Sequence, residues 1–85
     1  MKNREYVNEN PNGDKVTVRY MLDQNQIIFK EFVFEMESNV QLNWSHEAHV
    51  LMGFLCNLHG VKYFDSTENE YVKVTIVSPD DQILN

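Results

Sequence analysis

The residues best suited to chemistry gather in one stretch of the chain, residues 46–59. His46 and His49 are three residues apart, and so are Cys56 and His59. On a helix this spacing places each pair on neighbouring turns, as many metal sites do. The two pairs cannot share one metal, because His49 and Cys56 would lie about 10 Å apart along the axis. The rest of the sequence shows no other ligand-rich cluster, so we predict neither a metal nor a cofactor.

Nucleophilic catalysis has no better support. Ser45, His46 and Glu47 are sequence neighbours, and adjacent helical residues point about 100° apart, so they cannot form a relay. Cys56 falls in mid-helix, where no helix N-terminus lowers the pKa of a thiol. With three glycines in the chain there is also no glycine-rich phosphate loop. We therefore predict that the chain is not an enzyme.

The size and composition indicate one small domain over residues 1–85. Cys56 is the single cysteine, so no intramolecular disulfide forms, and the 42% of hydrophobic residues must supply the core. No apolar stretch follows the polar N-terminus. The longest apolar run, residues 50–56, is interrupted by Gly53 and is too short to span a bilayer. These features predict a cytoplasmic location with no membrane contact.

The charge restricts the choice of partner. Seven basic and thirteen acidic residues give a net charge of -6, and no two basic residues are adjacent. A negative chain is repelled by nucleic acid and by anionic lipid. We therefore expect no direct nucleic-acid binding, and a protein partner that is itself basic.

Two alternating segments predict an antiparallel hairpin. A turn at residues 10–14 precedes a strand over residues 15–22, and a second turn leads to a longer strand over residues 27–37. Residues 1–9 form either a short edge strand or a loose end. In the longer strand, simple alternation divides the side chains into two faces. One face would carry Ile28, Lys30, Phe32, Phe34 and Met36, and the other Ile27, Phe29, Glu31, Val33 and Glu35.

One helix follows the hairpin. It begins near residues 44–46, with Asn43 or Ser45 as the N-cap, and it ends at Gly60. Its predicted core stripe consists of Ala48, Leu51, Leu55 and Leu58, widened by Met52 and Phe54. Gly53 falls opposite this stripe.

The remaining segments complete an α+β fold. Residues 61–64 and 71–77 read as strands, separated by an acidic loop over residues 65–70 and followed by a tail over residues 80–85. The simplest architecture is an antiparallel sheet of four to five strands with one helix packed on one face. The order is strand, strand, strand, helix, strand, strand.

A single helix covers one face of a sheet, which leaves the face carrying Phe29 and Val33 without a partner. Either residues 1–9 or the tail with Ile83 and Leu84 cover it, or it is an exposed patch for a partner. In the second case aromatic anchors alternate with carboxylates that steer the partner. The expected partner-binding residues are Phe29, Glu31, Val33, Glu35, Glu37, Gly53, and the acidic-loop residues Asp65, Glu68 and Glu70.

Two functions remain. The first is a small non-enzymatic inhibitor whose carboxylates mimic nucleic acid and occupy a basic, nucleic-acid-handling protein. In size and sign of charge the chain is similar to anti-restriction, anti-CRISPR and nuclease-immunity proteins of phages and mobile elements, although the similarity covers composition alone. The alternative is a self-associating structural domain, for example a homodimer, with no role connected to nucleic acid.

Overall fold

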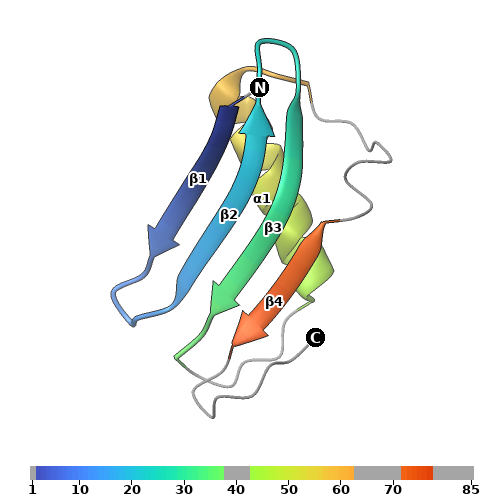
Figure 1. Cartoon of the computed structure of the whole chain (residues 1–85). Coiled ribbons are helices and arrows are strands. Elements are labelled where there is room, and N and C mark those ends of the chain that lie inside the picture. The colour runs from blue at the N-terminus through green and yellow to red at the C-terminus, as the bar shows by residue number, and fades with distance from the viewer. Residues whose placement is uncertain (1, 38–42, 63–71, 78–85) are drawn as a thin grey trace.

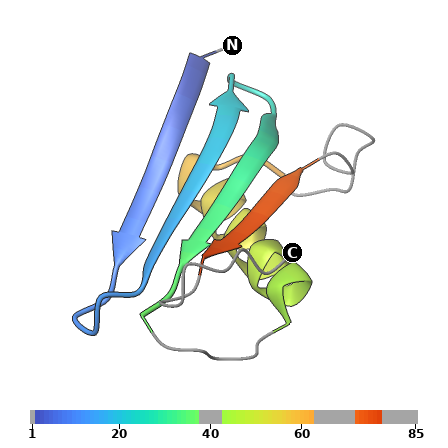
Figure 2. The ribbon, with the colours of Figure 1, turned by 60° about the horizontal axis from the view of Figure 1, so that its bottom comes forward.

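The computed structural model describes residues 2–37, 43–62 and 72–77, which form one sheet and one helix (Figure 1). The elements are β1 (Lys2–Glu9), β2 (Lys15–Leu22), β3 (Ile27–Glu35), α1 (Trp44–His59) and β4 (Lys73–Val77). The strands lie side by side in the order β1-β2-β3-β4, and α1 packs on one face (Figures 1 and 2). The predicted α+β class, with a sheet covered by one helix, is confirmed.

One edge strand agrees with an alternative that the sequence left open, and the other differs from the expectation. Residues 2–9 form a regular strand that pairs with β2 along its whole length. At the other edge, β4 pairs with β3 in parallel, not antiparallel as predicted. The reason is the connection: α1 carries the chain back along the sheet, and such a crossover returns the next strand in the same direction. Of the predicted strand 61–64, Val61 and Lys62 are not in a strand, and the other two residues lie outside the described ranges.

Both hairpin turns are built by the residue types that predicted them. Gly13 adopts a φ of 96°, in the left-handed region that favours glycine, and its N–H donates to the Asn10 carbonyl at 2.9 Å. In the second turn, Oδ1 of Asp23 accepts hydrogen bonds from the N–H groups of Asn25 and Gln26, at 2.8 and 2.9 Å. These two bonds lower the pKa of Asp23 below its ordinary value.

A β-bulge in the hairpin changes which residues of β3 face the helix. Arg19 is opposite Glu31, but the next residue, Tyr20, is opposite Phe29, so Lys30 is an extra residue in β3. Side chains on the two sides of the bulge therefore follow different alternations. Phe29, at 1% exposure, lies in the same core as Phe32. The prediction that Phe29 lies on the opposite, unpartnered face is wrong.

The helix ends are capped as predicted. Oδ1 of Asn43, the N-cap, accepts the N–H of His46 at 3.1 Å. At the other end Gly60 is left-handed with a φ of 70°, and the N–H of Val61 donates to the Cys56 carbonyl at 3.0 Å. These local signals fix the length of the helix to within a residue or two.

The face that α1 turns to the sheet differs from the predicted stripe. Its buried residues are Ala48, Met52, Leu55 and Cys56. Leu58 and Phe54, which were predicted to join the core, are 60% and 47% exposed. The physical reason is that the apolar residues of α1 span about two thirds of its circumference at 100° per residue. Such a pattern allows α1 to pack on the sheet in more than one rotation about its axis. Packing against the sheet decides which of these rotations is adopted.

The core lies between α1 and the three strands β2, β3 and β4. Its most deeply buried side chains are Val18, Phe29, Phe32 and Leu55. Rings continue along it at centroid separations of 4.9–6.3 Å, from Tyr20 through the phenylalanines of β3 to Trp44. This aromatic content stabilises a domain that has no disulfide. Within the described ranges, the length and apolar content of α1 fall short of a bilayer span.

Candidate protein-binding surfaces

The histidines singled out by their spacing make contacts within the fold. Nδ1 of His49 donates to the Ser45 carbonyl one turn earlier at 2.8 Å. Nε2 of His59 is 2.7 Å from the hydroxyl of Tyr20. Burial raises the pKa of that hydroxyl, and the positive charge of Arg4 lowers it by less. In the described part of the chain, no group of three or more His, Cys, Asp or Glu side chains is placed to hold a metal.

The cysteine is a core residue. Cys56 is 2% exposed on the sheet side of α1. Burial raises the pKa of its thiol, which disfavours the reactive thiolate at neutral pH. The side chain fills space between helix and sheet.

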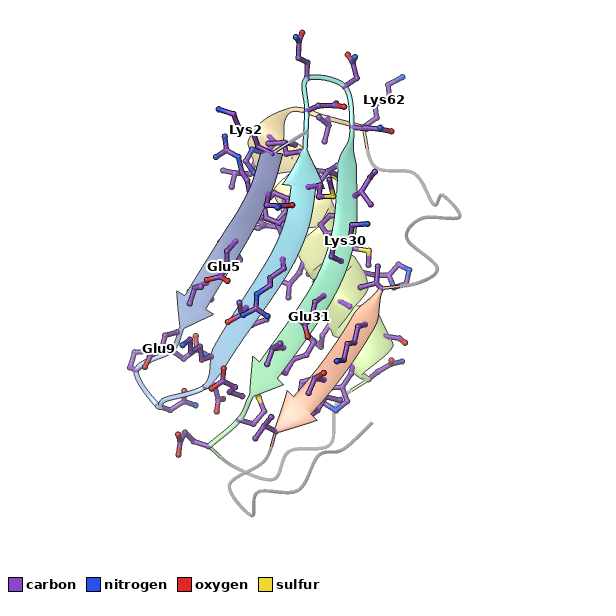
Figure 3. All side chains as sticks on the ribbon, viewed as in Figure 1. Lys2, Glu5, Glu9, Lys30, Glu31 and Lys62 are labelled. Atoms are coloured by element: carbon purple, nitrogen blue, oxygen red, sulfur yellow. The ribbon has the colours of Figure 1, made fainter. Side chains whose placement is uncertain are left out.

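The face of the sheet opposite α1, here called the open face, carries a row of alternating charge across all four strands. The paired positions are Glu5, Arg19, Glu31 and Lys73 (Figure 3). Arg19 donates through Nε to Glu5 at 3.1 Å and through Nη1 to Glu31 at 2.6 Å. The hydrogen bond to Glu31 raises the pKa of Arg19 further above its ordinary range. Glu31 therefore lies on the open face as predicted, but with its charge paired.

Other predicted partner-binding residues also have neighbours on this face. Val33 is half-buried in the next row, between Thr17 of β2 and Thr75 of β4. Glu35 is exposed and lies opposite Lys15. With Phe29 in the core, the open face has no aromatic anchor among its described residues. On the open face, the charged row that contains Arg19 lies beside the β-branched row that contains Val33. This face therefore does not form the expected aromatic patch bordered by acidic residues.

The remaining predicted partner-binding residues are Glu37, Gly53 and three residues of the acidic loop. The Glu37 backbone N–H donates to Oδ1 of Asp14 at 2.8 Å, which holds this residue beside the first hairpin turn. Gly53 lies in mid-helix, and a Cβ built on it would meet nothing within 4 Å. Among the described residues, no neighbouring element therefore requires a glycine there. Asp65, Glu68 and Glu70 lie outside the described residues.

A surface that sequence reasoning missed runs along α1. Val50, Phe54 and Leu58 are 53%, 47% and 60% exposed, and their spacing of four places them in one line. We call these three residues the helix strip. The ring of Tyr6, from β1, lies 5.6 Å from that of Phe54, so the strip passes beside the outermost strand. The spacing of four is visible in the sequence, but the predicted core stripe includes Phe54 and Leu58 and leaves Val50 out.

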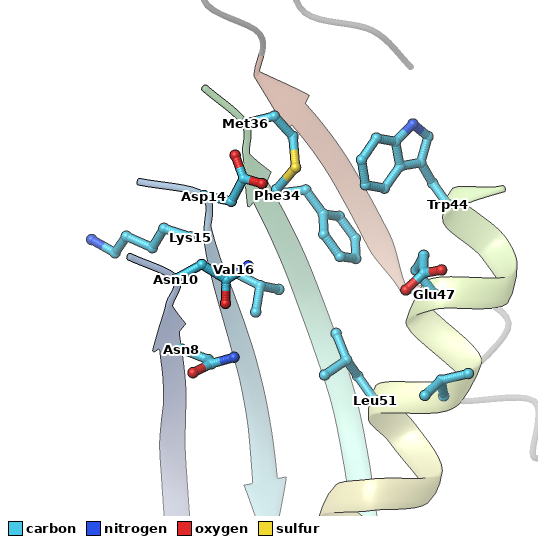
Figure 4. Close-up of a pocket in the computed structure, with 11 residues that line it drawn as sticks. Asn8, Asn10, Asp14, Lys15, Val16, Phe34, Met36, Trp44, Glu47 and Leu51 are labelled. Carbon is cyan, nitrogen blue, oxygen red and sulfur yellow. The ribbon is translucent and has the colours of Figure 1, made fainter. Parts of the chain in front are cut away.

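A groove of about 260 Å³ continues the helix strip toward the start of α1 (Figure 4). Val50 belongs to both features. Phe34 of β3 and Leu51 of α1 give the groove an apolar floor, whereas Asp14 and Glu47 place carboxylates at its sides. The groove, which has an apolar floor and polar sides, thus adjoins the helix strip at Val50.

The free edge of β1 completes this surface. Within the described ranges no strand pairs with the outer side of β1, so alternate backbone N–H and C=O groups point away from the sheet. Comparison of the chain with models of protein families, with curated proteins and with solved structures gave no match.

Proposed function

We propose that this chain is a non-catalytic protein-binding module whose binding surface is the helix strip together with the free edge of β1. The observation that carries the proposal is the exposure of Val50, Phe54 and Leu58 in one line. A chain of this size gains stability from each apolar side chain that it buries, and a continuous exposed line of them is typical of an interface.

The geometry beside the strip supports a polypeptide partner. Phe54 packs against Tyr6, which fixes an aromatic pair next to unpaired backbone groups of β1. Aromatic side chains supply much of the energy of protein interfaces, and an exposed strand edge adds main-chain hydrogen bonds. Both kinds of contact are available here along the same border of the molecule.

The test is capture of partners from a lysate of the native host by the tagged chain and two variants. Leu58→Lys places a charge in the helix strip, where the leucine makes little contact with its own core. His49→Lys is the matched control, since it changes an exposed residue of the same helix outside the strip. We expect Leu58→Lys to lose the bound protein and His49→Lys to retain it. Equal capture by all three chains would exclude the strip as the binding surface.

A second candidate is the acidic inhibitor of a basic, nucleic-acid-handling protein. One observation favours it: the described residues hold seven basic and eight acidic side chains, whereas the remaining 23 residues hold five acids and no base. The excess negative charge is thus concentrated in two short segments of the sequence, around residues 65–70 and 80–81. The ion pairs of the open face make Glu31 a poor mimic of phosphate.

Binding kinetics at several salt concentrations distinguish this second candidate. For a basic partner, added salt should slow association, because the Debye length falls from about 10 Å at 0.1 M to about 3 Å at 1 M. Glu68→Lys with Glu70→Lys should reduce the association rate more than Glu31→Lys with Glu35→Lys. Competing DNA or RNA should displace the chain. Association that ignores salt, the reversals and the competitor would exclude a charge mimic.

A further inference from the structure

The groove beside the start of α1 lies between this helix and the ends of β2 and β3 (Figure 4). Its volume of about 260 Å³ is below the roughly 300–1,000 Å³ of pockets that enclose drug-sized ligands. The groove is open to solvent and adjoins the helix strip at Val50. Its size therefore suits one side chain of a bound polypeptide better than a cofactor.

Two aromatic rings give the groove much of its apolar surface. Phe34 is 4% exposed, Trp44 is half-buried, and their ring centroids lie 4.9 Å apart. Leu51 continues this surface along α1. The faces of aromatic rings attract a cation, and tryptophan does so most strongly. An apolar surface also holds the methylene stem of a long basic side chain, whose charged head then lies at the border.

Two carboxylates border the aromatic surface. Asp14 lies on the strand side and Glu47 on the helix side, and both residues are half-buried (Figure 4). Oδ1 of Asp14 accepts the N–H of Glu37 at 2.8 Å, and its Oδ2 accepts Nδ2 of Asn12 at 3.2 Å. Both donors are neutral, so they leave the negative charge of Asp14 uncompensated. The groove therefore presents two anionic groups beside aromatic rings.

No cation of this chain occupies the groove. All seven lysines and arginines lie in the described ranges, and the ion pairs within these ranges join Arg19 to Glu5 and Glu31. Lys15 belongs to the groove lining, but it lies opposite Glu35 and its ammonium points away from the helix (Figure 4). A basic side chain in the groove would therefore belong to a second molecule.

From this charge complementarity we propose that the groove binds an arginine side chain of the polypeptide that occupies the helix strip. The proposal rests on the proposed function and specifies the partner, which presents an arginine beside apolar residues. The guanidinium would stack on the ring of Trp44 and donate N–H groups to Asp14 and Glu47. Arginine suits this place better than lysine, because its planar guanidinium is less strongly hydrated and carries five N–H donors.

The spacing along α1 allows one segment of the partner to use both features. Val50 lies three residues after Glu47 and Phe54 lies seven after it, which is about 4.5 and 10.5 Å along the helix axis. An extended chain covers the longer distance with about three residues. The arginine and the apolar residues that cover the helix strip would therefore be near neighbours in the partner's sequence.

The first experiment uses a single side chain as its probe. N-acetyl-arginine amide carries one charge, on the guanidinium, and N-acetyl-citrulline amide is its neutral counterpart of similar shape. Trp44 is the single tryptophan, so its fluorescence reports on the groove. At constant ionic strength, the arginine compound should change this fluorescence and bind about fivefold or more tightly than the citrulline compound. Equal binding of the two, or no change up to the solubility limit, would overturn the proposal. Tighter binding of N-acetyl-lysine amide would overturn the choice of arginine.

Two variants that lose the same charge locate the site. Glu47→Gln removes a carboxylate from the groove, and Glu35→Gln removes one from the open face. The arginine compound should bind Glu47→Gln about threefold more weakly and Glu35→Gln with unchanged affinity. Capture of a host protein should weaken in the same order. A similar loss of compound binding in both variants would reveal an effect of net charge alone, and the proposal would fall.

The outcomes separate this inference from the proposed function. Leu58→Lys should bind the arginine compound as the natural chain does, because Leu58 lies outside the groove. If capture requires Leu58, but neither capture nor the compound responds to Glu47→Gln, the binding surface stands and the arginine site is wrong. If the compound requires Glu47, but capture ignores both Leu58→Lys and Glu47→Gln, the arginine site is supported and the proposed function fails.

Discussion

At the scale of single residues, the polar groups with the clearest contacts hold turns, helix ends and strand pairs in place. Asp23 accepts two backbone N–H groups in its turn, Asn43 caps α1, and Arg19 joins β1 to β3 through two carboxylates. Their side-chain chemistry is used for local structure. Substitutions at these positions should therefore be read first as tests of folding.

The Asp23 turn predicts a pH dependence of stability. Because its folded pKa lies below the ordinary value of about 3.9, the folded state holds this proton less tightly than the unfolded state. The resulting stabilisation is present above the ordinary pKa and is lost as the pH falls through the folded pKa. Asp23→Asn keeps an oxygen acceptor for the turn but removes the titrating group. Urea unfolding between neutral pH and about pH 2 should show a shallower acid loss for Asp23→Asn than for the natural chain. Parallel curves would contradict this assignment.

Gly53 offers a test in which the substitution should be favourable. The position is helical and a Cβ meets open space, so alanine gains helix propensity without a clash. Gly53→Ala should raise the free energy of unfolding by about 1 kcal/mol. Gly60→Ala is the control, because its φ of 70° is strained for alanine and the change should destabilise the chain. Thermal unfolding of both variants measures the contrast, and loss of stability in Gly53→Ala would show that the helix is placed wrongly.

At the scale of elements, the orientation of α1 predicts different costs for one chemical change. Leu55 is fully buried, whereas Leu58, three residues later, is 60% exposed. Leu55→Ala should cost about 2–5 kcal/mol of unfolding free energy. Leu58→Ala should cost about 0.5 kcal/mol or less. Equal costs would mean that the helix is turned toward the stripe that the sequence pattern favoured.

The elements that sequence analysis predicted correctly are those encoded by neighbouring residues. The strand Lys15–Leu22, both turns, the Asn43 cap and the Gly60 end of α1 each depend on signals within a few positions. Alternation also placed Glu31, Val33 and Glu35 correctly on the open face, because all three follow the bulge in the sequence. Local patterning was therefore sufficient for the fold class.

The features that were missed depend on contacts between distant segments. At Lys30 the register between β2 and β3 shifts by one residue, which makes the bulge. The shift depends on both strands, so alternation along β3 alone cannot reveal it. The parallel direction of β4 depends on the path of α1 across the sheet. Two placements were wrong for the same reason: the bulge puts Phe29 in the core, and the orientation of α1 exposes the helix strip.

At the scale of the whole molecule, charge is distributed unevenly along the sheet. Lys2 and Lys62 lie toward one end of the strands, and Glu9 lies toward the other (Figure 3). Across the middle, the row containing Arg19 alternates in sign and binds the strands to one another. A partner that binds along β1 would therefore meet Lys2 toward one end of the strand and Glu9 toward the other.

The two edges of the sheet allow hydrogen exchange to test the proposed binding surface within a single sample. The amides of β2, which lies between two strands, should exchange slowest with or without a partner. When a captured partner is added, the outward amides of β1 should exchange more slowly, because the partner lies against this edge. The outward amides of β4 lie at the opposite edge and should exchange at a constant rate. Leu58→Lys should abolish the partner's protection of β1 without altering β4. Protection that rises at both edges would indicate general aggregation, and protection confined to β4 would place the interface on the other side of the sheet.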